Sequence, residues 1–517
     1  MSSTNGTVQS LPEHVRFAIV GSGFAGLGCA IRLKREGNED FVVLERASDL
    51  GGTWRDNSYP GCACDVPSHL YSFSFEPRPD WSRTFSTQPE IWDYLRECSR
   101  KYGVEPHIRY DHPVTGAAWD VDSEVWRLDT PRGSLSADFL VAGVGPLSDP
   151  KLPDIPGIDS FEGRIFHSAA WDHDYDLEGK RVAVIGTGAS SIQFVPKIEP
   201  LVARMHVFQR SAPWVVPQRD RRLTKPEQLL YRLFPPAQLV MRAAIYWLRE
   251  LFVLGFMHPR EGGVSERLAR KHLERQIDDP ELREKLTPRY RMGCKRVLIS
   301  DDYYPALQQA GVELVTDRIT KIRPHSIVTA DGTEREVDAI IMGTGFHVTD
   351  MPVAEWVRGR DGRTMAEVWQ GSPQAYLGTT VAGFPNLFFL VGPNTGLGHN
   401  SIVFMIESQL EHIADCIDYM ERSGAEVLEV REEVQEAFNE RIQQQLQGTV
   451  WNSGGCSSWY IDANGRNTTI WPDFTWRFRL QTRRFDAAAY DLAAPPSADG
   501  ATSRSLSARS LRTASAS

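Results

Sequence analysis

The sequence predicts an α/β fold with two nested Rossmann-like dinucleotide-binding domains and a helical insert. Two glycine-rich motifs, each led by an apolar strand and followed by a helical pattern, begin at Arg16 and Arg181. Two further apolar strands with glycine-rich exits follow, at 336–346 and 384–396. A chain of 517 residues is long enough for several domains with cores of their own. This order indicates a chain that builds one domain, inserts a second, and returns to the first.

The first motif, RFAIVGSGFAG, has the features of a dinucleotide-binding βαβ unit. Gly21 permits a tight turn, Gly23 lets the backbone approach a pyrophosphate, and Gly26 lets helix and strand pack closely. The next apolar strand, FVVLE, ends at Glu45, which can accept hydrogen bonds from a ribose. We assign this unit to FAD, with Phe24 and Ala25 of the same loop as further contacts.

The second motif, RVAVIGTGASS, repeats the strand and the turn with Gly186 and Gly188. Ser191 replaces the third glycine, and a residue of that size still allows fairly close packing. The following strand, MHVFQRS, ends with Arg210 and Ser211 where the first unit has an acid. An arginine would bind the 2′-phosphate that an acid would repel, so the second site is predicted to prefer NADPH over NADH.

Two nested dinucleotide sites suit a flavoprotein that takes a hydride from NADPH. We expect 1–147 and 351–494 to form the FAD-binding domain, and 148–223 and 290–350 the NADPH-binding domain. The insert, 224–289, is predicted to be helical, either as a lid over the substrate cavity or as structural cladding. A disulfide reductase would need a redox cysteine pair after the first motif, and the sequence has none there. An NADPH oxidase or dehydrogenase needs no further motif, whereas a monooxygenase must also use oxygen.

Composition and charge argue against some classes of partner and against a membrane-spanning segment. The net charge of −10 argues against a nucleic-acid partner. The polar N-terminus resembles no signal peptide, and the apolar segment 239–257 carries Arg242, Arg249 and Glu250, too many charges for an easy membrane span. A buried or interfacial helix is predicted there, with weak membrane contact as the alternative. The tail, 495–517, is predicted to be disordered.

The cysteines predict a cytoplasmic protein with reduced thiols, since their number is odd and their spacing scattered. The CxC pair has no second ligand pair at metal spacing, so it is predicted to be structural and no metal is expected. The seven are Cys29, Cys62, Cys64, Cys98, Cys294, Cys416 and Cys456.

Two longer patterns identify a family. The stretch FEGRIFHSAAWD matches the signature FxGxxxHxxxW followed by Pro or Asp at each fixed position, namely Phe161, Gly163, His167, Trp171 and Asp172. The stretch GGTWRDNSYPGCACD matches a second family pattern, in which Gly-x-Trp is followed by an aromatic residue with Pro-Gly and then by Asp. The matching residues are Gly52, Trp54, Tyr59, Pro60, Gly61 and Asp65. The chain therefore resembles the type I Baeyer–Villiger monooxygenases of the class B flavoprotein monooxygenases. The related N- and S-oxidising flavin monooxygenases, whose signature usually lacks the Trp–acid ending, are the alternative.

The resemblance implies that FAD, reduced by NADPH, forms a peroxyflavin with O2 that inserts one oxygen beside a ketone carbonyl, giving an ester or lactone. Arg296 in GCKRVLISDDYY would be the cation that stabilises the developing negative charge, oriented by Asp65. Lys295 would join Arg210 at the 2′-phosphate. The signature would act as a linker that coordinates domain movement, with His167 orienting it rather than transferring a proton.

The resemblance also implies further contacts with the cofactors. Those with FAD are Thr53, Trp54, Arg55, Asp56, Asp65, Tyr71 and Val114. Those with NADP are Ala63, Cys64, Asp65, Thr187, Gly188, Ala189, Ser190, Ser191, Ile192, Gln193, Lys295, Arg296 and Trp459. The segment after Trp459 departs from the family, because Gly465, Arg466 and Asn467 stand where many members have Ile-Pro-Gly.

Overall fold

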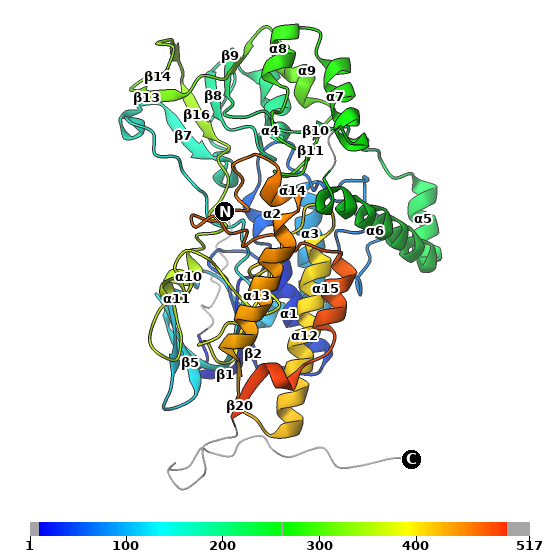
Figure 1. Ribbon diagram of the computed structural model, residues 1–517, viewed down its shortest axis with the longest axis vertical. Helices are drawn as coiled ribbons and strands as arrows, with labels where there is room; N and C mark the ends of the chain where they lie inside the picture. Colours follow the sequence, from blue (N-terminus) through cyan, green and yellow to red (C-terminus); the bar gives the residue numbers. More distant parts are fainter. Residues whose placement is uncertain (1–9, 260–261, 494–517) are drawn as a thin grey trace, which may run out of the picture.

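The computed structural model describes residues 10–259 and 262–493. The predicted disordered tail lies outside the described residues. Two separate sheets confirm the predicted α/β class, one in the lower and one in the upper half of Figure 1. The first part of the helical insert, 225–257, projects from the side of the molecule at the right of this view, and the second part, 264–285, lies at the top beside the upper sheet.

The first sheet has eight strands, in the order β17-β4-β5-β6-β1-β2-β3, with β18 also paired to β6. The first motif lies at its centre, where β1 pairs in parallel with β2 and β6. The helices α1 (Phe24–Arg35) and α12 (Ile402–Ser423) pack against each other beside it. The strands are β1 (His14–Val20), β2 (Phe41–Leu44), β3 (Ile108–Arg109), β4 (Gly116–Asp120), β5 (Val125–Thr130), β6 (Gly133–Ala142), β17 (Val357–Arg358) and β18 (Leu387–Phe389).

The second sheet has five parallel strands, in the order β12-β9-β8-β16-β7. The second motif supplies β8 and α4 (Ser191–Ile198), and the predicted strand in 336–346 is β16. The family signature contributes the edge strand β7, so part of it is a strand and not only a connector. The strands are β7 (Arg164–His167), β8 (Arg181–Ile185), β9 (Arg204–Phe208), β12 (Val312–Val315) and β16 (Ala339–Met342).

The insert is helical, as predicted. Thr224 and Glu227 form a capping box at the start of α5, so the backbone N–H groups of both residues are satisfied by side chains. The helices are α5 (Lys225–Leu233), α6 (Pro235–Met257), α7 (Val264–Gln276) and α8 (Pro280–Lys285). Within the described residues, no helix is both long and apolar enough to cross a membrane.

The C-terminal part returns to the first sheet and covers it with α12, α13 (Glu432–Gln447) and α15 (Thr475–Thr482) (Figure 1). The remaining helices are α3 (Gln88–Lys101) and the short α2 (Thr53–Asp56), α9 (Tyr303–Leu307), α10 (Val353–Trp356), α11 (Met365–Trp369) and α14 (Val450–Ser453). The remaining strands are β10 (Val215–Val216), β11 (Leu298–Ile299), β13 (Ile319–Arg323), β14 (Ser326–Thr329), β15 (Glu334–Glu336), β19 (Val427–Val430) and β20 (Tyr490–Ala493).

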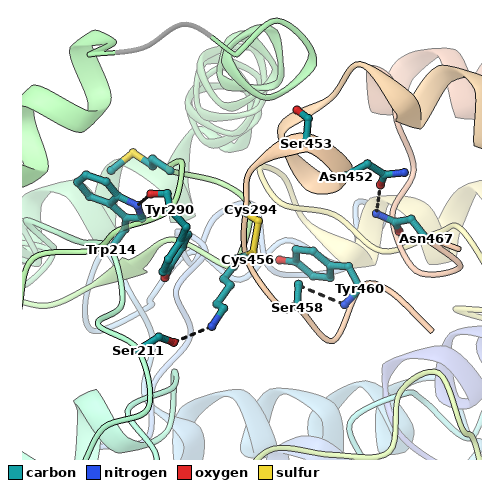
Figure 2. The surroundings of a disulfide bond; sticks show 12 residues. Ser211, Trp214, Tyr290, Cys294, Asn452, Ser453, Cys456, Ser458, Tyr460 and Asn467 are labelled. Carbon is teal, nitrogen blue, oxygen red and sulfur yellow. Dashed lines mark hydrogen bonds between the residues drawn. A yellow bond between two sulfur atoms is a disulfide. The ribbon is translucent and has the colours of Figure 1, made fainter. Parts of the chain in front are cut away.

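A disulfide between Cys294 and Cys456 corrects the prediction that the cysteines are all reduced (Figure 2). Their separation of 162 residues gave no sequence signal, because only the fold brings the turn before Lys295 against the end of α14. The packing there is tight, since a Cβ added at Gly454 would lie 2.5 Å from that of Cys294. The other five cysteines are free and buried, and no cluster of metal-ligating side chains occurs within 10–259 and 262–493.

Removing this disulfide is expected to lower the stability of the protein. A cross-link that closes a loop this long restricts the unfolded chain, and typical stabilisation is about 2–4 kcal/mol. We expect Cys456→Ser to unfold at a lower denaturant concentration than the wild type, and a reductant to shift only the wild type. A wild-type transition that ignores the reductant would contradict the prediction.

Candidate functional site

The first glycine motif forms a shallow cradle between β1 and α1. Gly21 has a positive φ of 95°, and a Cβ there would lie 2.7 Å from the carbonyl oxygen of Gly143. A Cβ at Gly26 would overlap the carbonyl oxygen of Gly21, which explains the need for a third glycine. Gly52 packs against Gly23, since a Cβ at Gly52 would lie 3.1 Å from the Cα of Gly23. Because these glycines carry no side chains, the backbone at the start of α1 can approach a pyrophosphate closely.

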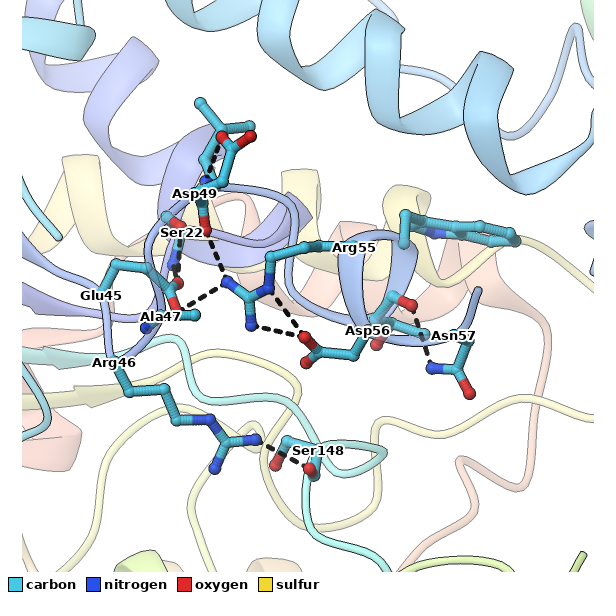
Figure 3. Close-up of polar contacts among 12 residues, drawn as sticks. Ser22, Glu45, Arg46, Ala47, Asp49, Arg55, Asp56, Asn57 and Ser148 are labelled. Carbon is cyan, nitrogen blue, oxygen red and sulfur yellow. Dashed lines mark hydrogen bonds and ion pairs between the residues drawn. The ribbon is translucent and has the colours of Figure 1, made fainter. Parts of the chain in front are cut away.

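Glu45 lies at the end of the second strand, as predicted, and both of its oxygens already have protein partners (Figure 3). Oε2 accepts hydrogen bonds from the Ser22 backbone N–H at 3.0 Å and from its hydroxyl at 2.6 Å. Oε1 accepts from the Ala47 N–H at 2.9 Å and from Arg55 at 2.8 Å. Arg55 also pairs with Asp56. Sequence reasoning missed Ser22, which fixes the carboxylate in the orientation that a ribose would meet.

Trp54 and Tyr71 lie next to this cradle, in edge-to-face contact and joined by a hydrogen bond of 3.1 Å from the indole N–H to the phenol oxygen. Thr53 begins α2 beside them. Burial raises the pKa of Tyr71 well above its usual value, so its hydroxyl stays protonated. Val114 instead packs against the core on the far side of the first sheet, with Leu11 and Val144.

Arg296 and Asp65 form a bidentate ion pair, with both N–O distances at 2.6 Å. Burial alone would raise the pKa of Asp65, but the charge and the hydrogen bonds of Arg296, together with the charge of Arg249, outweigh it and the pKa is lowered. Asp65 in turn raises the pKa of Arg296. The pair is therefore charged at any physiological pH, and the planar guanidinium has one fixed orientation.

Two residues beside this pair escaped the sequence analysis. Arg249 of α6 donates a hydrogen bond of 3.1 Å to the backbone carbonyl of Asp65. Tyr460 is buried, which raises its pKa to about 12. The charges of Arg296 and Asp65 also act on this pKa, in opposite directions. The sequence signal that could have identified Arg249 is its charge within an apolar helical segment, because a buried charge needs a polar partner.

A pair of cations, Arg210 and Lys295, lies near the end of β9. Lys295 donates a hydrogen bond of 2.7 Å to the Ser211 hydroxyl. Burial, followed by repulsion from Arg210, lowers the pKa of Lys295. Neither cation forms an ion pair with a carboxylate of the described residues. Two neighbouring cations and a hydroxyl with no anion between them suit a phosphate group.

The second glycine loop follows β8 and leads into α4. Gly186 has a φ of 105°, and a Cβ there would overlap the carbonyl oxygen of Gly343. Ser191 packs directly against Gly343, so a serine is tolerated because its neighbour is a glycine. A Cβ at Gly188 would meet nothing within 4 Å, so the loop from Thr187 to Ser190 is open for a ligand.

Gln193 joins the two predicted nucleotide sites. Its side-chain amide donates to the backbone carbonyl of Ala63 at 2.9 Å, and its oxygen accepts from the Tyr59 hydroxyl at 3.0 Å. Ile192 is buried behind it. Burial raises the pKa of Cys64, so this thiol is neutral and not a nucleophile. Asp65 thus follows a segment that is anchored on α4.

Trp459 is not brought into this arrangement. Its side chain is 43% exposed, and its ring centroid lies 4.4 Å from that of Tyr460. It follows the Cys456 disulfide, and Tyr460 lies beside that disulfide in Figure 2. The contact of Trp459 with NADP stays a prediction.

The signature segment is held by packing. A Cβ at Gly163 would overlap the carbonyl oxygen of Asp338 and lie 2.6 Å from the ring of Phe161. Trp171 packs between other aromatic rings, and Asp172 pairs with Arg164. His167 is buried and lies edge-on to Phe346, in the loop after β16. These contacts favour a structural link over a role in proton transfer.

We expect His167 to make stability depend on pH. Burial lowers its pKa to about 4, against the weaker opposing effect of the Gly345 backbone, whereas an unfolded histidine has a pKa of about 6.5. Between these values only the unfolded chain binds the proton, so stability is complete above pH 6.5 and declines as the pH falls towards 4.

In unfolding experiments, His167→Gln should remove about 2 kcal/mol of the stability that the wild type loses on going from pH 7 to pH 5. His325→Gln, which changes an exposed histidine, is the matched control. Parallel pH curves for wild type and His167→Gln would contradict this prediction.

The fold and the site together define a flavoenzyme with two dinucleotide sites, a fixed arginine at their junction and a pair of cations suited to a 2′-phosphate. The family model described as flavin-binding monooxygenase-like matches residues 14–356. A Baeyer–Villiger monooxygenase of Streptomyces coelicolor is 54% identical, covering 94% of each chain, and one of Pseudomonas aeruginosa is 51% identical, covering 94% of this chain and 92% of the relative.

Solved structures agree with these relatives. A closed crystal structure of cyclohexanone monooxygenase matches with a TM-score of 0.84 and 29% identity, covering 94% of this chain and all of that one. A steroid monooxygenase bound to NADP matches with a TM-score of 0.81 and 30% identity, covering 93% of this chain and 99% of that one. The chain belongs to the flavin-binding monooxygenase-like family and, within it, to the Baeyer–Villiger monooxygenases. FAD and NADP(H) are its cofactors.

Proposed function

We propose that the enzyme converts a ketone and O2 to an ester or lactone at the expense of NADPH, with Arg296 holding the negative charge that develops on the reacting oxygens. The bidentate pair of Arg296 with Asp65 is the observation that carries this proposal. FAD, once reduced by NADPH, supplies the electrons that activate oxygen. A cation fixed in advance stabilises such charge without having to reorganise during the reaction.

The residues of this chain have separate roles in the proposal. The cradle around Gly23, with Glu45 at the ribose, would hold FAD. Lys295, Arg210 and Ser211 would hold the 2′-phosphate of NADPH. Asp65 is the positioning residue for Arg296, and Arg249 supports it through its backbone carbonyl.

A permanent cation also favours the Baeyer–Villiger reaction over oxidation of amines or sulfides. Nucleophilic attack on a carbonyl needs an anionic oxygen, which Arg296 would stabilise, whereas oxidation of nitrogen or sulfur needs an electrophilic, protonated one. The location proposed is the cytoplasm, where NADPH is supplied.

We also propose the division of the chain that the sequence suggests, with 1–147 and 351–494 around FAD and 148–223 and 290–350 around NADPH. Its support is that the first sheet draws its strands from 14–142 and 357–389, and the second from 164–342.

The test is a panel of ketones incubated with the holoenzyme, NADPH and ¹⁸O2. One ¹⁸O atom in the product ester for each NADPH consumed is the expected result. Hydrogen peroxide without any ester would identify an oxidase. Products only from amines or sulfides would move the enzyme to the N- and S-oxidising class.

A further inference from the structure

The helix α6 has its polar side chains on the inside and its apolar side chains on the outside. Its polar residues point into the protein and are bonded there. Gln238 bonds to the ring of His69 and donates to the backbone carbonyl of Arg78. Arg242 donates to the backbone carbonyls of His69 and Ser72, while Glu250 accepts from Asn400 and Thr475. A helix on the surface of a water-soluble body has the opposite arrangement.

The outward face of α6 carries large apolar side chains at helical spacing and no charge. Val240, Trp247 and Leu251 fall on one stripe and are 70%, 57% and 61% exposed, and Leu248 beside them is 60% exposed. Leu233 at the end of α5 continues the face. We call this surface, on the hairpin that projects at the right of Figure 1, the α5–α6 face. An exposed apolar face of this extent marks a contact surface.

Two cavities show what kind of partner the α5–α6 face could accept. One, of about 500 Å³, lies between α5 and α6 and is lined by Leu230, Phe234, Val240 and Met241 among other apolar side chains. The other, of about 450 Å³, lies between Trp247 and α15, where Leu480 and Arg483 line it. The first would accept a hydrocarbon chain. The second combines aromatic and apolar groups with the Arg479–Glu411 ion pair and with Arg483.

Arginines gather beside this second cavity although the chain as a whole is acidic. Arg483 and Arg484 are exposed and form no ion pair with a carboxylate of the described residues. Apolar side chains and tryptophan flanked by unpaired arginines are the pattern of a helix that lies in the interface of an anionic bilayer. A second copy of the chain would bring the same arginines rather than the anions that they lack.

We propose that the α5–α6 face docks on the surface of a phospholipid bilayer that contains anionic lipids. The axis of α6 lies along the membrane, its apolar stripe enters the acyl-chain boundary, and Arg483 and Arg484 contact the headgroups. The inner face of the same helix holds Arg249 against Asp65, so α6 separates the bilayer from the predicted reaction centre. Apolar ketones dissolved in the bilayer would then enter beside α6, a consequence that rests on the proposed function.

The test is cosedimentation of the full-length holoenzyme with sucrose-loaded vesicles of phosphatidylcholine, with and without phosphatidylglycerol. We expect binding to both, and tighter binding when phosphatidylglycerol is present. The double variant Leu248→Glu, Leu251→Glu should bind about tenfold more weakly to both. Arg483→Gln with Arg484→Gln should lose only the preference for phosphatidylglycerol. Leu201→Glu, at an exposed leucine of the second domain, is the control and should bind like the wild type.

Three outcomes would overturn the proposal: no sedimentation with either vesicle, equal binding by the double glutamate variant, or a phosphatidylglycerol preference that survives loss of both arginines. Analytical ultracentrifugation tests the alternative, in which a second copy of the chain occupies the α5–α6 face. A wild-type dimer that the glutamate variant converts to a monomer would mean that a second copy covers this face. Flavin absorbance confirms that each variant is folded, and no measurement here depends on turnover.

Discussion

Replacing Arg296 with alanine is expected to reduce ester formation by about a thousandfold while FAD stays bound and reducible by NADPH. The guanidinium lies at the junction of the two predicted nucleotide sites, and Asp65 holds it there by two hydrogen bonds. The glycine cradle and Glu45 lie elsewhere and remain intact. The flavin should therefore lose its absorbance with NADPH as in the wild type, and the electrons should leave as hydrogen peroxide.

The measurement is the amount of ester and of hydrogen peroxide formed for each NADPH consumed. Arg296→Lys retains the charge but cannot form the bidentate pair, so its loss of activity separates charge from orientation. Arg127→Ala, an exposed arginine on the β5 strand paired with Asp120, is the matched control and should behave like the wild type. Ester formation at the wild-type rate by the alanine variant would remove Arg296 from the mechanism.

The parts of the candidate site that the sequence makes predictable are those that a short segment determines. Gly21, Gly26 and Glu45 belong to one βαβ unit, and the steric reason for each glycine holds in the structure. Ser191 is similar, although its tolerance depends on Gly343, which only the return strand brings into contact. Both dinucleotide motifs were therefore predictable before the tertiary structure was known.

The parts that escaped prediction depend on contacts between distant segments. Arg249 reaches Asp65 from α6, 184 positions away, and the disulfide joins Cys294 to Cys456 over 162 positions. The reversed polarity of α6 was equally invisible, because the apolar pattern is the same whichever face meets the protein. Only the bonding of Arg242, Arg249 and Glu250 decides which side lies inside.

Replacing Arg210 with alanine is expected to raise the KM for NADPH by about 10- to 100-fold and to leave the KM for NADH nearly unchanged. A hydrogen bond to a charged group contributes about 1.5–3 kcal/mol, and only NADPH has the 2′-phosphate that would receive it. Steady-state kinetics with both coenzymes gives the two values. Because Arg210 is exposed, the substitution should not disturb the fold.

The second cation makes this prediction sharper. Burial, followed by repulsion from Arg210, lowers the pKa of Lys295, so removing Arg210 relieves the repulsion and leaves Lys295 as the remaining cation of the pair. Lys295→Ala should therefore weaken NADPH binding on its own, and the double variant should no longer distinguish the two coenzymes. Ser211→Ala, which removes only the hydroxyl that Lys295 contacts at 2.7 Å, is expected to have a smaller effect. Equal increases in both KM values for Arg210→Ala would mean that this arginine supports the loop and does not bind the phosphate.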